Sequence, residues 1–156
     1  MSLEIEPVSR PTSEAASLIS ELDDVLGALY EPEQRHGYSI EQIFQPNVRL
    51  FIARLGDNAV GCGAVAFFDR YAEVKRMYVR DSARGQGVAD AILARIEAEV
   101  RGAGLSVLRR ETGDRQVAAM RLYARAGFRA CPAFRAYASM PPQSIATSVF
   151  FEKYLG

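Results

Sequence analysis

The chain has 156 residues, of which 49% are hydrophobic and 24% are charged, and its 19 basic and 19 acidic side chains give zero net charge. This composition is typical of a globular protein, and we expect residues 1–156 to form a single domain. No run approaches the ~20 apolar residues of a membrane span, and the N-terminus lacks the basic segment of a signal peptide. We therefore expect a cytoplasmic protein without a membrane partner.

The side chains give little support for metal, redox or nucleic-acid functions. The two cysteines, Cys62 and Cys131, lack metal-ligand spacing, and the single His36 does not complete a zinc site with them. We predict no metal site, reduced thiols, and a Cys62 that is buried in a strand. Zero net charge and the lack of a basic and aromatic stripe argue against a nucleic-acid partner.

Charge is unevenly distributed along the chain. Residues 1–74 carry 12 acidic and 5 basic side chains, whereas residues 75–129 carry 12 basic and 6 acidic ones. A basic block of this kind is either an anion-binding region or a solvated surface without a role. Charge alone does not distinguish the two interpretations.

The first half of the chain predicts two helices and four strands. Leu3–Val8 alternates apolar and acidic residues, as a half-buried strand does, and Pro7 favours an edge or a strand end. The turn at 56–58 favours a hairpin, and Gly61 and Gly63 within its second strand indicate close packing or a bulge. The predicted elements are a strand over 3–8, a helix from 12 or 13 to 30, a short helix over 39–44, and strands over 48–54, 59–68 and 73–79.

The second half alternates between helices and strands. Two glycines separate the strand over 73–79 from a helix, and a further strand follows that helix. This order predicts a right-handed crossover between two parallel strands. The predicted elements are a helix over 87–101, a strand over 105–109, a helix over 114–126, a strand beginning at 128–131, a loop over 132–144 and a final strand over 147–154.

The loop before the 87–101 helix, Arg84–Ala89, has the composition of a phosphate site. A glycine-bearing turn at a helix start presents unpaired backbone N–H groups, backed by the positive end of the helix dipole. No Lys-Ser/Thr pair follows Gly87, as a P-loop requires, and no Gly-x-Gly-x-x-Gly follows the first strand. The loop therefore indicates a phosphate site of another kind.

A second candidate region is the helix over 114–126. Its residues Gln116, Ala119, Met120 and Tyr123 share one face, so a ligand along that face would touch all four. Tyr123 can donate a proton to a leaving thiolate, because a phenol is both an acid and a hydrogen-bond donor. Its alternative role is that of a core tyrosine packed beneath Phe128.

These two regions together resemble the GNAT superfamily of acyl-CoA N-acyltransferases. The motifs are Arg-x-x-Gly-x-Ala at 84–89 and Leu-Tyr-x-Arg-x-Gly-Phe at 122–128, and the order of elements matches from Leu3 to Tyr154. The resemblance implies an α/β (α+β) fold, with a central mixed, splayed, mostly antiparallel sheet of about seven strands and about four flanking helices. The sequence departs from the usual pattern at Gln116, where many members have Asn, and at Ala89, where many have Gly.

The resemblance also implies a binding mode for acetyl-CoA in the split of the sheet. The backbone of Met77–Val79 would pair with the pantetheine amides, the N–H groups of Gln86–Ala89 would hold the pyrophosphate, and Arg125 would meet a CoA phosphate. The residues assigned to acetyl-CoA in this way are Met77, Tyr78, Val79, Arg84, Gly85, Gln86, Gly87, Val88, Ala89, Gln116, Met120, Tyr123 and Arg125.

Acetyl transfer to an amine needs a base, because a protonated amine is not nucleophilic. Glu73 is our candidate, since the resemblance to the histone acetyltransferase branch implies a Glu at this distance before Val79. The period of two along a strand places on one face Glu73, Lys75, Met77 and Val79. The alternative role of Glu73 is that of an ion-pair partner only, and the alternative bases are Glu111 and a water chain.

The acceptor is expected to bind at the polar stretch over 31–38, because members of the family place substrate contacts between the first two helices. The predicted substrate-binding residues are Tyr30, Arg35, His36, Tyr38 and Glu73. A histidine on the surface without a role is the alternative for His36. Phe134, Arg135 and Tyr137 would close the other side of the pocket or support a dimer contact.

We therefore predict an N-acetyltransferase that moves an acetyl group from acetyl-CoA to a primary amine of a small molecule by direct attack in a ternary complex. Arg35, Arg76 and Arg135 favour an amine with a carboxylate, such as an amino acid or a related metabolite. The acidic first half favours a basic amine or a protein N-terminus. Alternative functions are an inactive CoA-binding or sensing module and a protein N-terminal or lysine acetyltransferase. A homodimer is expected from the family alone.

Overall fold

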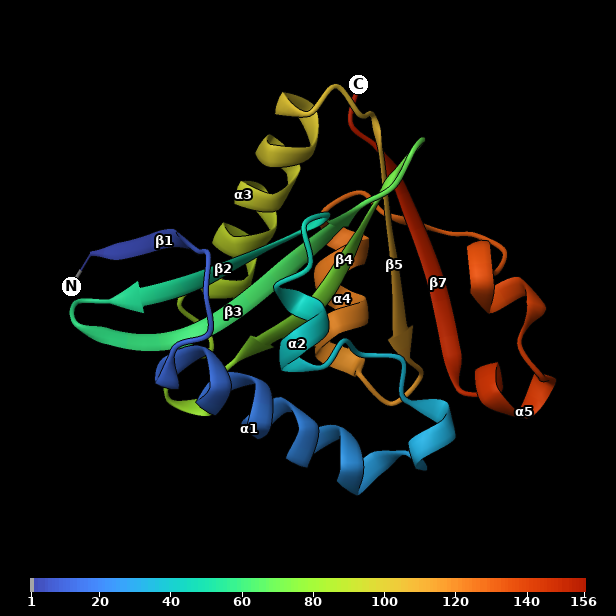
Figure 1. Ribbon diagram of the computed structural model, residues 1–156, viewed down its shortest axis with the longest axis horizontal. Helices are drawn as coiled ribbons and strands as arrows, with labels where there is room; N and C mark the ends of the chain where they lie inside the picture. Colours follow the sequence, from blue (N-terminus) through green and yellow to red (C-terminus); the bar gives the residue numbers. More distant parts are fainter. Residues whose placement is uncertain (1) are drawn as a thin grey trace.

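The computed structural model describes residues 2–156, and its strands form one seven-stranded sheet in the order β1-β2-β3-β4-β5-β7-β6 (Figure 1). All neighbouring strands are antiparallel except β4 and β5, which are parallel. The predicted mostly antiparallel mixed sheet is therefore confirmed. The strands are β1 (Leu3–Val8), β2 (Val48–Leu55), β3 (Asn58–Phe67), β4 (Ala72–Val79), β5 (Val107–Gly113), β6 (Arg129–Ala130) and β7 (Ser148–Tyr154).

Helices cover both faces of this sheet and bury a separate hydrophobic cluster on each. One cluster contains the apolar face of α3 and the end of α4, and the other contains α1 and α2. Thr12 caps α1 by accepting a hydrogen bond from the Ala15 backbone N–H at 3.1 Å. The helices are α1 (Ser13–Leu29), α2 (Ile40–Ile43), α3 (Val88–Gly102), α4 (Val117–Arg125) and α5 (Pro142–Ile145).

The sheet splits between β4 and β5, as the predicted splayed sheet requires. The two strands pair only where Ala72–Val74 faces Leu108–Arg110. Beyond these pairs β4 and β5 diverge, and α4 lies behind the widening gap (Figure 1). The split therefore leaves the end of β4 without a strand on one side.

A β-bulge in β4 corrects our prediction that four alternate residues share one face. Three steps along β4, from Lys75 to Tyr78, oppose only two steps along β3, and Arg76 has a positive φ of 54°. The extra residue reverses the alternation. Glu73 and Lys75 therefore contact Tyr137, whereas Met77 and Val79 pack on the opposite face with the α3 cluster.

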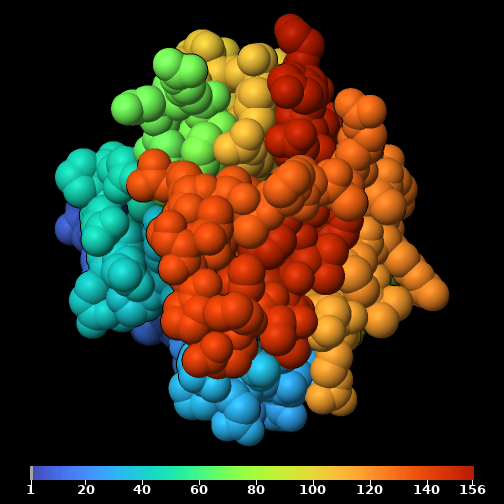
Figure 2. Space-filling model, turned by 90° about the vertical axis from the view of Figure 1, so that its right-hand side faces the viewer, coloured from blue at the N-terminus to red at the C-terminus, as the bar shows by residue number. Residues whose placement is uncertain are grey.

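The second half of the chain departs from prediction in three places. The helix predicted over 114–126 is α4, which covers only Val117–Arg125, with Gln116 as its N-cap. Strand β5 covers 107–113 instead of 105–109, because its polar residues up to Gly113 pair with β7. The predicted loop over 132–144 contains a 3₁₀ helix, Arg135–Ser139, and α5. This segment covers one face of the molecule and meets the chain around residues 31–36 (Figure 2).

The predictions for Pro7, Gly61 and Gly63 are confirmed. Pro7 lies in β1, which is an edge strand of the sheet. A Cβ on Gly61 would lie 2.8 Å from the Tyr78 carbonyl oxygen, and one on Gly63 would lie 2.5 Å from Ile92 of α3. These two glycines therefore allow close packing beside the bulge. No helix among residues 2–156 is long and apolar enough to cross a membrane.

Cys62 makes the unfolding free energy sensitive to alkaline pH. Burial raises the pKa of its thiol from 9.0 to about 12. Between these values the folded chain holds a proton that the unfolded chain has lost, so this group's contribution to stability falls as pH rises. We expect Cys62→Ala to lose less unfolding free energy than wild type between about pH 8 and 10. Urea unfolding at both pH values measures the difference, and equal losses in the two proteins would contradict the prediction.

Candidate active site

A cleft of about 530 Å³ lies between the end of β4, the glycine loop, α1 and α4. Leu22 and Val25 of α1 form one wall, and Val25 is exposed although it is a large apolar residue. The residues that line the cleft come from segments that are distant in the sequence, and they surround one space because the sheet is split. Its remaining lining residues are Met77, Tyr78, Val79, Ala83, Arg84, Gly85, Gly87, Val88, Ala89, Asp90, Gln116, Ala118, Ala119, Arg121, Leu122 and Arg125.

The glycine loop has the backbone conformation that a phosphate site needs. Gly85 and Gly87 both have a φ of 78°, and Gly87 is the N-cap of α3. A Cβ at either position would meet nothing within 4 Å, so the backbone is accessible from the cleft. The first N–H groups of α3 lack acceptors within the helix, and Arg84 and Arg125 line the same cleft. This donor set fits the pyrophosphate of a CoA molecule.

Most residues that the sequence assigns to acetyl-CoA line this cleft, but three do not. Gln86 is exposed, and its amide contacts the Ser82 carbonyl oxygen at 3.4 Å. Met120 and Tyr123 are also absent from the lining, because the face of α4 toward the cleft carries Ala118, Ala119, Leu122 and Arg125 instead. A CoA contact for these three residues stays a prediction.

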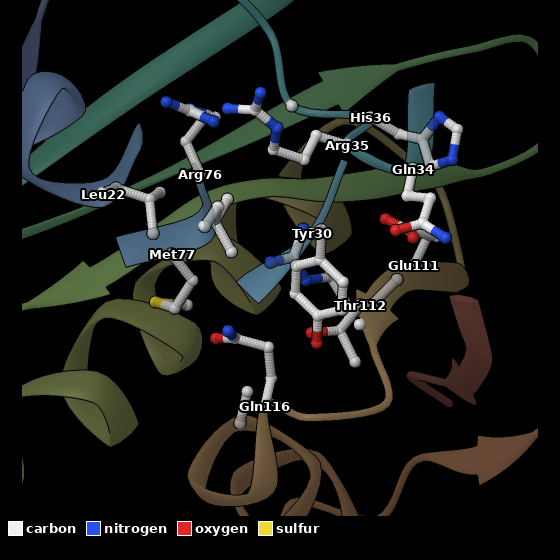
Figure 3. A pocket seen from close by; sticks show the side chains of 15 residues that line it. Leu22, Tyr30, Gln34, Arg35, His36, Arg76, Met77, Glu111, Thr112 and Gln116 are labelled. Carbon is white, nitrogen blue, oxygen red and sulfur yellow. The ribbon is translucent and has the colours of Figure 1, made fainter. Parts of the chain in front are cut away.

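A second, narrower cavity of about 60 Å³ adjoins the cleft (Figure 3). The two cavities share the lining residues Leu22, Met77, Gln116 and Ala119. In Figure 3 Arg35 and Arg76 lie along one edge of the second cavity, and Gln116 lies at the opposite edge. Two molecules, one in each cavity, would therefore meet near Met77 and Gln116.

The structure brings three of the five predicted substrate residues to this second cavity. Tyr30, Arg35 and His36 line it, whereas Tyr38 and Glu73 do not. The Tyr30 hydroxyl accepts a hydrogen bond from the Arg115 backbone N–H at 2.8 Å. His36 Nε2 lies 2.7 Å from the Ser144 carbonyl oxygen, which ties the cavity wall to α5.

Glu73 lies in a buried network beside the second cavity. One carboxylate oxygen accepts a hydrogen bond from the Tyr137 hydroxyl at 2.8 Å and pairs with Lys75 Nζ at 3.0 Å. Burial lowers the pKa of Lys75, and burial together with the Glu73 charge raises the pKa of Tyr137. The ring of Tyr38 lies 4.4 Å from the Lys75 ammonium, so Tyr38 belongs to this network also.

Glu111 and Tyr123 are the other candidates for proton transfer. Glu111 lines the second cavity and accepts a hydrogen bond from the Ser148 hydroxyl at 2.7 Å. Tyr123 is fully buried, and its ring packs against Phe128, with 5.3 Å between the ring centres. The Tyr123 hydroxyl accepts a hydrogen bond from Arg110 Nε at 3.0 Å, and Arg110 lines the second cavity.

The structure corrects the predicted place of Arg135 and adds residues that the sequence reasoning did not assign to the site. The guanidinium carbon of Arg135 lies 4.0 Å from the centre of the Phe68 ring, and Arg135 lines neither cavity. Phe134 and Tyr137 instead join Tyr71 and Phe150 in an aromatic cluster. The unassigned lining residues of the second cavity include Gln34, Gly37, Arg110 and Thr112. The run of polar residues over 109–112, in an otherwise apolar strand, was the available signal.

The comparisons with known proteins all indicate the same family. Residues 18–128 match the acetyltransferase (GNAT) family. The chain is 41% identical over 140 residues to an IAA acetyltransferase of Azospirillum brasilense, with 88% of each chain covered. A proposed acyl-CoA N-acyltransferase structure from Klebsiella pneumoniae has a TM-score of 0.80 and 33% identity, with 99% of this chain and 98% of that chain covered. The PaiA N-acetyltransferase of Thermoplasma acidophilum, solved in complex with coenzyme A, has a TM-score of 0.75 at 16% identity, with 99% of each chain covered.

The chain belongs to the acetyltransferase (GNAT) family, because the family match covers well over half of its residues. It is an acyltransferase enzyme, and acetyl-CoA is its cosubstrate. The cleft beside the glycine loop combines backbone donors at the α3 N-terminus, two arginines and the end of β4, which has no strand on one side. Binding of acetyl-CoA at these residues stays a prediction.

Gly87 is the position where a single methyl group tests the CoA site. We expect Gly87→Ala to weaken CoA binding by at least about tenfold, because a side chain at positive φ is strained and its methyl group enters the cleft. Isothermal titration with CoA measures this change. Gly104→Ala is the matched control, since Gly104 has a φ of 82° and equally open surroundings but lies outside the cleft. Similar CoA affinities in the two variants would argue against the loop as the phosphate site.

Proposed function

We propose that this enzyme transfers an acetyl group from acetyl-CoA to the primary amine of a small molecule by direct attack in a ternary complex. The observation that carries the proposal is the junction of the two cavities at Met77 and Gln116. An acyl donor in the cleft and an amine in the second cavity would meet there without a covalent enzyme intermediate. The small volume of the second cavity, about 60 Å³, favours a small molecule over a protein N-terminus or a lysine side chain.

The reaction requires two proton transfers. The amine nitrogen forms a bond to the thioester carbonyl carbon and gives up a proton, and the carbon–sulfur bond breaks as the CoA sulfur gains a proton. We propose Glu111 as the base, because its side chain lines the acceptor cavity. Glu73, the base expected from the sequence, is buried against Lys75 and Tyr137 and stays the alternative. Tyr123 is the proposed acid.

The proposed function is tested by thiol release from acetyl-CoA across a panel of amines. We expect at least one small primary amine to accelerate release and to be recovered with an added acetyl group. Peptides with free N-termini or lysines form the second arm of the panel. Acceleration by peptides alone would replace the small molecule with a protein acceptor, and CoA binding without acceleration by any amine would contradict the proposal. The cytoplasmic location and the homodimer stay predictions from the sequence.

The two carboxylates are distinguished by their glutamine variants. We expect Glu111→Gln to lower kcat by about 100-fold or more and to remove the acidic limb of the pH profile, because the base is lost. We expect Glu73→Gln to lower the melting temperature instead, since it leaves the buried Lys75 without its counter-charge. Steady-state kinetics and thermal unfolding of both variants measure these effects. The reverse pattern would make Glu73 the base, and unchanged kcat in both would favour the water chain.

Tyr123→Phe tests the proposed acid. Removing the hydroxyl from a general acid is expected to lower kcat by about 100-fold or more, with little change in KM for the amine. The variant also leaves Arg110 Nε without its acceptor, so a moderate loss of stability accompanies it. A smaller effect of Tyr123→Phe on kcat with an acetyl thioester donor whose thiolate is a better leaving group would support the acid role. A loss of stability with unchanged kcat would assign Tyr123 to the core alone.

A further inference from the structure

The second cavity is lined by an arginine, Arg76, whose backbone is held in an unfavourable conformation. Arg76 lies at the bulge of β4 with a positive φ of 54°, a conformation that is unfavourable for any residue with a side chain. Its guanidinium is 4% exposed and donates to Asp23 at 2.5 Å and to the Ile19 carbonyl oxygen at 3.3 Å. The bulge therefore directs a charged group into the acceptor cavity instead of letting it follow the strand alternation.

Gly37 makes room for this guanidinium. A Cβ at position 37 would lie 2.1 Å from Arg76 Nη1 and 3.1 Å from its Cζ. Any side chain there would displace the guanidinium from its present place. Both the positive φ of Arg76 and the absence of a side chain at Gly37 are therefore needed to hold the Arg76 guanidinium in its present position.

Two buried donors in this cavity lack acceptors. Among the side chains of residues 2–156, the Nε atoms of Arg35 and Arg76 are both buried and have no hydrogen-bond partner. Both residues line the second cavity and lie along the same edge of it (Figure 3). A buried donor of a charged group without a partner is unfavourable, so a ligand with acceptor atoms would be stabilised there.

The charges around the cavity favour an anionic ligand group. Arg35, Arg76 and Arg110 line it, while Glu111 is the one acidic lining residue in the described part of the chain. Asp23 neutralises Arg76, but no ion pair within residues 2–156 involves Arg35. An acceptor that carried only a cationic amine would be repelled at this edge. A carboxylate offers two oxygens, and arginine binds carboxylates in a bidentate manner.

We propose that the acceptor is a small amine that also bears a carboxylate, and that Arg35 and Arg76 bind this carboxylate at the edge of the cavity away from Gln116. This inference rests on the proposed function, and it assigns the substrate class and the two residues that select it. With the carboxylate at the arginines, a short acceptor directs its amine toward Glu111 and the junction with the cleft. Because the cavity has a volume of only about 60 Å³, we expect only a few bonds between the two groups.

The test compares amino acids with their amides, which differ only in the charge of the group that the arginines would bind. We expect wild type to prefer the acids in kcat/KM by about 10- to 100-fold, and Arg35→Gln to abolish this preference by raising KM for the acids alone. Arg35→Lys should restore part of it. Arg135→Gln is the matched control, because Arg135 is outside both cavities and should leave the preference unchanged.

A binding measurement tests the inference about the carboxylate without requiring that the enzyme turn over an amine. Titration of the CoA-loaded protein with N-acetyl amino acids and with their amides should show tighter binding of the acids, and Gly37→Ala should remove the difference by displacing Arg76. Thermal unfolding checks that Gly37→Ala is folded. Equal binding of acids and amides by wild type, or equal losses for both in Arg35→Gln, would overturn the inference even if the enzyme acetylates amines. If acids bind selectively and no amine is acetylated, the proposed function fails and the carboxylate site stands.

Discussion

The short pairing between β4 and β5 is the constraint on which the rest of the site depends. The two strands share only three residue pairs before they separate, because β5 continues along β7 while β4 follows β3. Backbone groups at the end of β4 and the start of α3 are thereby left available to a ligand. The cleft that we propose for acetyl-CoA and the smaller cavity that we propose for the acceptor share the lining residues Met77 and Gln116 beside this split.

The bulge at Arg76 turns the side chains before and after it toward opposite faces of the sheet. Before the bulge, Glu73 and Lys75 contribute to a buried network with Tyr137, which binds the late segment of the chain to the sheet. After it, Met77 and Val79 line the larger cleft and pack against the α3 core. At the bulge itself the Arg76 side chain lines the second cavity. One extra residue therefore lets a single strand contribute to a buried network and to both cavities.

The parts of the candidate site that the sequence predicted are those that depend on residues close together in the chain. The glycine loop depends on positive φ at Gly85 and Gly87 and on the start of α3, and both are encoded within a few residues. The lining by Tyr30, Arg35 and His36 also follows from one polar stretch between two helices. Glu73 and Tyr123 were assigned to the site from the family resemblance and their chemistry, and Arg135 from its place in the late loop. Their surroundings come from aromatic and ionic partners distant in the chain, which these local signals do not report.

The sequence by itself determined the family, the order of elements, the edge position of β1 and the glycine loop before α3, because each depends on periodicity, turn chemistry or a contiguous motif. Only the tertiary structure decided which side chains line the two cavities. A single bulge reverses the alternation of β4, the pairing with β7 extends β5 to Gly113, and α4 presents Ala119 and Leu122 instead of Tyr123 to the cleft. These outcomes depend on contacts between strands and helices that are far apart in the sequence, and no local pattern contains them.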